Sequence, residues 1–159
     1  MISRTPPVYI AVIGGSKATG DILPVAWQVG QEIARRGAVL LCGGLGGVMS
    51  TAARGAQEAG GVSIGILPGP DRQDANPYLT YSLPTNLGHA RNVLIAHSAD
   101  GLIAVDGEYG TISEAAIALK LGKPVVGLSV TWRLEGVAMV MTSQEAVDLI
   151  LQRIKKCGV

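Results

Sequence analysis

The chain has 159 residues, enough for one domain that buries roughly two thirds of the surface its unfolded chain exposes. Its 13 basic and 12 acidic residues leave a net charge of +1, without the basic excess that is typical of nucleic-acid-binding proteins. Two cysteines, Cys42 and Cys157, are too few for a metal cluster or a disulfide framework.

No apolar run approaches the ~20 residues that cross a bilayer. The apolar run at residues 8–13 is too short for the core of a signal peptide and ends at two glycines. We therefore expect one cytoplasmic domain spanning residues 1–159, with neither a membrane nor a nucleic acid as partner.

Short apolar runs alternate with helical patterns along the chain. Strands are predicted over residues 8–13, 39–42, 62–67, 101–105 and 125–129. Helices are predicted over residues 22–36, 48–59, 89–99, 112–121 and 143–156, and Thr142 with Glu145 predicts a capping box for the last of them. This alternation indicates an α/β domain with a mainly parallel sheet flanked by helices.

One irregular insertion, residues 68–84, interrupts this alternation. It carries prolines that mark turns, with a possible short strand near residues 78–83. The insertion is either a lid or an edge of the sheet. Cys42, at the end of an apolar strand, is interpreted as a packing residue.

Three small-residue loops follow predicted strands. Because ligands of open parallel sheets bind beyond the carboxyl ends of the strands, we expect these loops to form one site. Glycine lets a ligand approach the backbone closely, and serine and threonine add hydroxyl donors. The loop residues are Gly14, Gly15 and Ser16, then Gly43, Gly44, Gly46 and Gly47, then Gly107, Gly110 and Thr111.

The third loop, residues 106–111, is the most informative. It joins a buried strand to a predicted helix that begins near Thr111 and Glu114, and free N–H groups at a helix start favour an anion such as phosphate. A second interpretation stays open, because Thr111 and Glu114 also match a capping box in which the glutamate only satisfies a helix-start N–H. No loop has the glycine spacing of an NAD or ATP signature.

Several linked motifs resemble one known superfamily. They are residues 43–49 with Met49, the pair Arg91 and Asn92, the glycines Gly107 and Gly110 with Thr111 and Glu114, and residues 119–124. The pattern resembles the Rossmann-like superfamily that contains the molybdenum cofactor carrier proteins and the Lonely Guy phosphoribohydrolases; some relatives carry a lysine decarboxylase label. The resemblance implies a single three-layer Rossmann-like domain.

The resemblance implies two alternative functions. In a carrier, the glycine loops would hold the molybdenum cofactor or a similar phosphorylated heterocycle, with Arg91 supplying charge. In a phosphoribohydrolase, Arg91 and Glu114 would be catalytic and would cleave the N-glycosidic bond of a nucleoside 5'-monophosphate. Where the hydrolases have Arg-Lys and Pro-Gly-Gly, this chain has Arg91-Asn92 and Asp106-Gly107-Glu108, which favours the carrier.

By this resemblance the expected binding set also includes Met49, Asn92, Glu108 and Tyr109. A carboxylate at Glu108 would repel a phosphate if it faced the site, and it would be strained if the position required a positive φ. Pyridoxal phosphate is not expected, because no lysine is placed to form a Schiff base. His89 and His97 lack a third ligand, so no metal site is predicted.

A self-associated chain is also expected. The predicted helices at residues 89–99 and 112–121 carry apolar residues beyond one stripe, including Val93, Ile95, Ile117 and Leu119. This breadth favours a homodimer or homotetramer with its ligand sites near the subunit contact.

Overall fold

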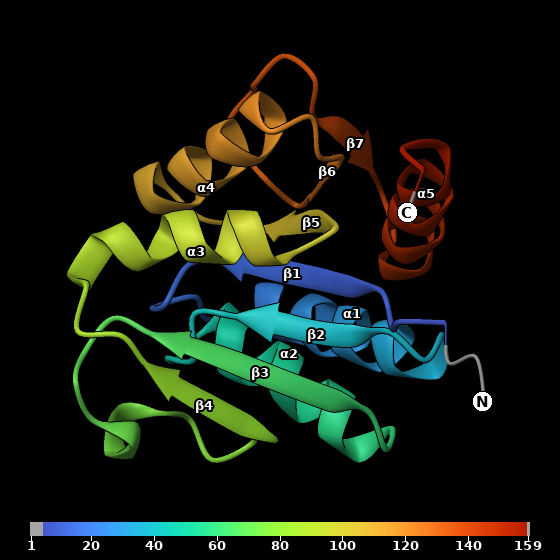
Figure 1. Cartoon of the computed structure of the whole chain (residues 1–159). Coiled ribbons are helices and arrows are strands. Elements are labelled where there is room, and N and C mark those ends of the chain that lie inside the picture. Colours follow the sequence, from blue (N-terminus) through green and yellow to red (C-terminus); the bar gives the residue numbers. More distant parts are fainter. Residues whose placement is uncertain (1–4, 159) are drawn as a thin grey trace.

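The computed structural model describes residues 5–158, and its centre is a sheet of seven parallel strands in the order β4-β3-β2-β1-β5-β6-β7 (Figure 1). The strands are β1 (Tyr9–Gly14), β2 (Val39–Cys42), β3 (Val62–Leu67), β4 (Tyr81–Pro84), β5 (Gly101–Val105), β6 (Val125–Leu128) and β7 (Ala138–Val140). The chain leaves β1 toward β2 and later returns to the other side of β1 as β5. The strand order therefore reverses between β1 and β5, where an open sheet forms its ligand crevice.

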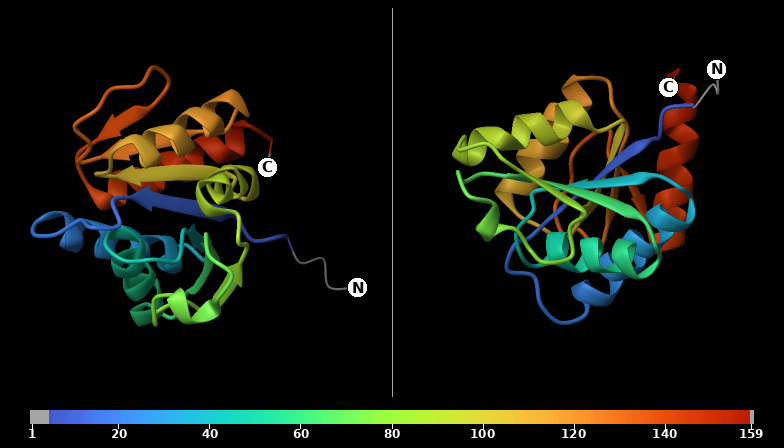
Figure 2. Two further views of the ribbon diagram at one scale, coloured as in Figure 1. Left: turned by 90° about the vertical axis from the view of Figure 1, so that its left-hand side faces the viewer. Right: turned by 60° about the horizontal axis from the view of Figure 1, so that its bottom comes forward.

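Two layers of helices cover the sheet, one on each face (Figure 2). One layer holds α1 (Ile22–Arg35), α2 (Val48–Glu58) and α5 (Ser143–Lys156), and the other holds α3 (Arg91–Ser98) and α4 (Tyr109–Lys120). Short 3-10 turns span Arg72–Asp74 and Gly88–Ala90. The predicted three-layer α/β fold is thereby confirmed.

The alternation of side chains along the strands builds a separate apolar cluster under each helical layer. In β1, Ile10 and Val12 pack toward α1, α2 and α5, whereas Ala11 and Ile13 pack toward α3 and α4. All four side chains are buried, as expected for a strand covered on both faces. Over residues 5–158, no helix combines the length and apolar character that a membrane span requires.

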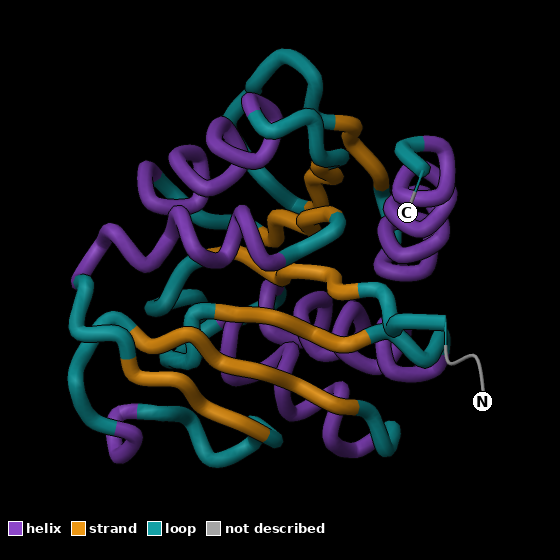
Figure 3. Tube along the Cα trace, viewed as in Figure 1, coloured by secondary structure: helices purple, strands orange, loops and turns teal. Residues whose placement is uncertain are grey.

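Five predicted strands are confirmed within one residue at each end. The possible strand near residues 78–83 is β4, which begins three residues later, and the irregular insertion proves to be an edge. It ends in β4, which pairs in parallel with β3 at the margin of the sheet (Figure 3). β7 was not predicted, because it has only three residues and none is fully buried. The capping box of α5 is confirmed, since Thr142 and Glu145 satisfy each other's backbone N–H groups.

Two predicted helix starts were wrong. Residues 88–90 form a 3-10 turn, so the helix predicted from residue 89 begins at Arg91. The helix predicted from residue 112 begins three residues earlier, at Tyr109. This shift moves Thr111 and Glu114 inside α4, where both side chains are buried.

Packing within the chain explains part of the wide apolar surface of α3 and α4. Ile95 is fully buried and cannot form a subunit contact, whereas Ile117 and Leu119 are partly buried against the cluster beneath the two helices. Val93 and Leu94 are exposed. The homo-oligomer stays a prediction, which the mass of the protein in solution would test.

Candidate functional site

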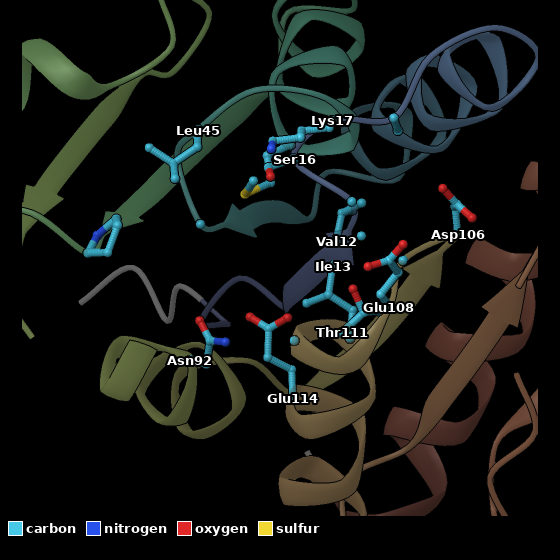
Figure 4. A pocket seen from close by; sticks show the side chains of 18 of the residues that line it. Val12, Ile13, Ser16, Lys17, Leu45, Asn92, Asp106, Glu108, Thr111 and Glu114 are labelled. Atoms are coloured by element: carbon cyan, nitrogen blue, oxygen red, sulfur yellow. The ribbon is translucent and has the colours of Figure 1, made fainter. Parts of the chain in front are cut away.

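A cavity of about 710 Å³ opens at the carboxyl ends of β1 and β5, at the point where the strand order reverses. The loops after β1, β2 and β5 all contribute to its lining, as predicted (Figure 4). The predicted residues that line it are Gly14, Gly15, Ser16, Gly43, Met49, Arg91, Asn92, Gly107, Glu108, Gly110, Thr111 and Glu114.

Four residues predicted to bind the ligand lie outside this lining: Gly44, Gly46, Gly47 and Tyr109. Gly44 packs against Leu67, and a Cβ on Gly47 would lie 2.2 Å from the Gly15 carbonyl oxygen. These two glycines therefore allow chain segments to pack closely rather than a ligand to approach. The Tyr109 side chain is 88% exposed and does not line the cavity.

The loops after β1 and β2 are joined directly to each other. The Val48 N–H, at the start of α2, donates to the Gly15 carbonyl over 3.0 Å. A Cβ on Gly14 would lie 2.3 Å from the Val105 carbonyl oxygen. Glycine is therefore required at this position, and the close contact fixes the first loop against β5.

The loop from β5 to α4 presents the first turn of α4 to the cavity. Asp106 and Gly107 have φ values of 56° and 95°, and a Cβ on Gly107 would lie 2.1 Å from Thr111 Oγ1. The first hydrogen bond of the helix runs from the Ile112 N–H to the Glu108 carbonyl over 2.9 Å. The N–H groups of Tyr109, Gly110 and Thr111 precede it and remain for a ligand or solvent.

Glu108 does not carry the backbone strain that the sequence suggested. Its φ is −123°, which any residue adopts, and its side chain is exposed at the rim. The left-handed conformations fall instead on Asp106 and Gly107. Aspartate tolerates this region better than most residues with a side chain.

Arg91 is held beneath the loop after β2. Its Nη1 donates to the Ile66 carbonyl over 3.0 Å, and a Cβ on Gly43 would lie 1.9 Å from that nitrogen. The Nε atom is buried and has no hydrogen-bond partner within residues 5–158. Burial lowers the pKa of the guanidinium, and the nearby Glu114 opposes that shift.

Glu114 projects into the cavity from the second turn of α4 (Figure 4). The capping interpretation is wrong, because Glu108 occupies the N-cap position and no side chain of residues 5–158 caps the helix. Burial raises the pKa of Glu114 to about 7, and the positive charge of Arg91 only partly offsets it. Such a carboxyl group changes its ionisation near neutral pH.

Cys42 is a packing residue, as interpreted from the sequence. It is fully buried at the end of β2, and burial raises the pKa of its thiol to about 11. A thiol with that pKa stays protonated and unreactive at neutral pH.

Nine lining residues were not predicted: Val12, Ile13, Lys17, Ala18, Leu45, Pro68, Gly88, His89 and Asp106. Lys17 and Leu45 belong to the loops already singled out, so the predicted residues next to them in the sequence could have pointed to both. Pro68 directly follows β3. The rule that ligands bind beyond the carboxyl ends of the strands, applied to β3 as well, would have identified Pro68.

The lining carries both signs of charge. Asp106, Glu108 and Glu114 are acidic, whereas Lys17 and Arg91 are basic. In Figure 4 the Asp106 and Glu108 carboxylates lie away from Glu114. An anion in this cavity would therefore depend on the main-chain donors of α4 rather than on a surplus of positive side chains.

Comparisons with known proteins match this chain over nearly its full length. A model of the SLOG cluster4 family matches residues 7–156. A protein of Archaeoglobus fulgidus, described only as uncharacterized, is 46% identical over 142 residues, or 89% of this chain and 93% of that protein.

Two solved structures are also similar at more than 30% identity. The molybdenum cofactor binding protein of Rippkaea orientalis matches with a TM-score of 0.89 and 36% identity, over 95% of this chain and 99% of that one. The molybdenum cofactor carrier protein Mcp of Chlamydomonas reinhardtii matches with a TM-score of 0.86 and 33% identity, over the same fractions of the two chains. The resemblance to the carrier proteins is thereby confirmed.

The buried carboxyl group makes a testable contribution to stability. Because the folded-state pKa of Glu114 is raised from 4.5 to about 7, its stabilising contribution is complete below pH 4.5 and is lost as the pH rises through 7. Glu114→Gln removes this titration. Relative to the wild type, the variant should therefore become more stable to unfolding as the pH rises from 4.5 to 7. The difference between the two free energies of unfolding should grow by on the order of 3 kcal/mol over this range and level off above pH 7.

Chemical denaturation of both proteins at a series of pH values measures this difference. A difference that stays constant from pH 4 to pH 8 would show that Glu114 titrates normally in the folded protein.

Proposed function

The chain belongs to the SLOG cluster4 family, and from this premise we propose that it binds and carries the molybdenum cofactor or a closely similar phosphorylated heterocycle. The observation that carries the proposal is the cavity at the reversal of strand order, into which a helix start directs unbonded N–H groups. The likeness to two molybdenum cofactor proteins, each matched over 99% of its length, supports the same ligand.

The phosphate of the ligand would occupy the start of α4. The N–H groups of Tyr109, Gly110 and Thr111 precede the first helical hydrogen bond, and the positive end of the helix dipole favours an anion there. The hydroxyl groups of Ser16 and Thr111 line the same cavity and can add donors. A Cβ on Gly110 would meet no atom within 4 Å, which leaves room for the phosphate oxygens.

The heterocycle would extend from the phosphate across the loop after β2. Gly43 gives it a surface without a side chain, and Leu45, Met49 and Pro68 give it apolar contacts. The volume of about 710 Å³ lies within the ~300–1,000 Å³ that small-molecule sites usually have. Binding would break no bond in the ligand.

A ligand that binds only the folded state raises its stability. We expect the molybdenum cofactor, at about 100 times its Kd, to stabilise the protein by about 2.7 kcal/mol, seen as a higher Tm in anaerobic thermal unfolding. The bound cofactor should also be oxidised more slowly than the free cofactor. Saturating cofactor that neither shifts the Tm nor slows oxidation would refute the proposal.

Gly110→Asp provides the matched variant for this measurement. An aspartate in the first turn suits the helix dipole, and its side chain meets open space, so the unliganded protein should keep its Tm. The added carboxylate should reduce the cofactor-induced shift, because it would lie next to the phosphate.

One observation favours a second candidate function, phosphoribohydrolase activity. A carboxyl group with a pKa of about 7 beside an arginine is suited to acid-base catalysis at neutral pH. On this alternative, Glu114 would activate water or stabilise the developing ribosyl cation when AMP is cleaved to adenine and ribose 5-phosphate.

Chromatographic detection of adenine tests the alternative. If this alternative holds, the wild type should release adenine from AMP, and Glu114→Gln should lose at least about 100-fold in rate, the usual scale of a general acid-base contribution. If the wild type releases no adenine, or if the variant retains full turnover, Glu114 has no catalytic role with this substrate.

A further inference from the structure

The Glu114 side chain is buried but has no hydrogen-bond or ion-pair partner among the residues that the structure describes. It is 7% exposed, and within residues 5–158 it accepts no hydrogen bond and forms no ion pair within 4.0 Å, although Arg91 is near enough to influence its pKa. The guanidinium instead donates to the Ile66 carbonyl. A buried carboxylate without donors is costly, so its two oxygens are available to a ligand that supplies them.

Asn92 complements this carboxyl group. It lies on α3, which packs against α4, and its amide and the Glu114 carboxyl both reach into the cavity (Figure 4). Neither side chain is committed to a hydrogen bond within the described part of the chain. Together they offer one amide donor and two carboxylate acceptors from neighbouring helices.

We infer that Asn92 and Glu114 recognise the aminopyrimidinone edge of the bound heterocycle, the edge shared by pterins and guanine. This edge presents a carbonyl oxygen, a ring N–H and an exocyclic amino group in sequence. The Asn92 amide donates to the carbonyl oxygen, and the two Glu114 oxygens accept from the ring N–H and the amino group. The inference rests on the proposed function, because it assumes a phosphorylated heterocycle in this cavity.

Other heterocycles match this arrangement less well. Adenine presents a ring nitrogen acceptor beside its amino group, and that acceptor would face a carboxylate oxygen without a proton between them. Hypoxanthine has the carbonyl and the ring N–H but lacks the amino group, so one Glu114 oxygen would remain buried and unpaired. The apolar side chains of Leu45 and Met49 line the cavity and would pack against any flat ring without discriminating between these bases.

Three nucleoside monophosphates separate these possibilities, because they share the phosphate and differ at this edge. Calorimetric titration of the wild type at pH 8 should give tighter binding of GMP than of IMP, by about tenfold for the lost hydrogen bond to a charged group. AMP should bind more weakly than GMP. In Glu114→Gln the amide presents one donor and one acceptor, so GMP should lose at least about tenfold while AMP is unchanged or improved.

Glu108→Gln is the matched control, because it removes one carboxylate charge from the rim of the same cavity. If charge alone explained the effect, it would change the GMP to AMP ratio as Glu114→Gln does. We expect Glu108→Gln to tighten the binding of all three nucleotides equally and to leave the ratio of the GMP and AMP affinities unchanged. Should Glu114→Gln fail to fold, Asn92→Asp tests the same edge. The carboxylate of this variant would repel the carbonyl oxygen of guanine and weaken the binding of GMP.

The outcomes distinguish this inference from the proposed function. Equal binding of the three nucleotides, an unchanged ratio in Glu114→Gln, or no GMP binding by a protein that the molybdenum cofactor does stabilise would each overturn the inference alone. If neither the nucleotides nor the cofactor bind, the proposed function fails and the inference fails with it.

Discussion

The site depends on how closely β1 and β5 approach each other where both strands end. Gly14 and Val105 are register partners in the two strands, and any Cβ on Gly14 would collide with the Val105 carbonyl. This contact brings the loop after β1 against the loop that starts α4. Because α1 and α4 then leave on opposite faces of the sheet, a cavity opens between them, and the first turn of α4 faces it. The glycine at position 14 thus helps to set the geometry of the cavity, and of the anion site proposed there, without contributing a side chain.

The parts of the fold that follow from burial could be predicted from the sequence. β1, β2, β5 and β6 are nearly continuous apolar runs, and β3 is interrupted only by Ser63, because both faces of the sheet are covered. β7 has three residues that are not fully buried and gives no such run. The start of α4 was misplaced because residues 111–114 fit a capping box equally well, and only the left-handed turn at Asp106 and Gly107 lets the helix begin at Tyr109.

The binding residues were harder to identify, since glycine serves two purposes that look alike in a sequence. Gly43 and Gly107 line the cavity and also leave no room for a Cβ beside Arg91 and Thr111, whereas Gly44 and Gly47 lie outside the lining and only pack against Leu67 and Gly15. Both purposes require the absence of a Cβ. Arg91 presents a similar difficulty: its position was predicted from the family motif, but its bond to the Ile66 carbonyl depends on a contact across 25 residues of chain. Because the guanidinium makes that bond, it does not hydrogen-bond to Glu114, whose carboxyl group is left for the proposed ligand.

The proposed binding of a phosphate by the main-chain N–H groups at the start of α4 can be tested residue by residue. Amide resonances of uniformly 15N-labelled protein, followed while GMP is added, report on each of these groups separately. We expect the largest shift changes on Tyr109, Gly110 and Thr111. The basic groove formed by Lys123, Arg153 and Lys156 lies elsewhere on the molecule. Shift changes centred on that groove, with the amides of Tyr109 to Thr111 unmoved, would show that the phosphate does not bind at α4.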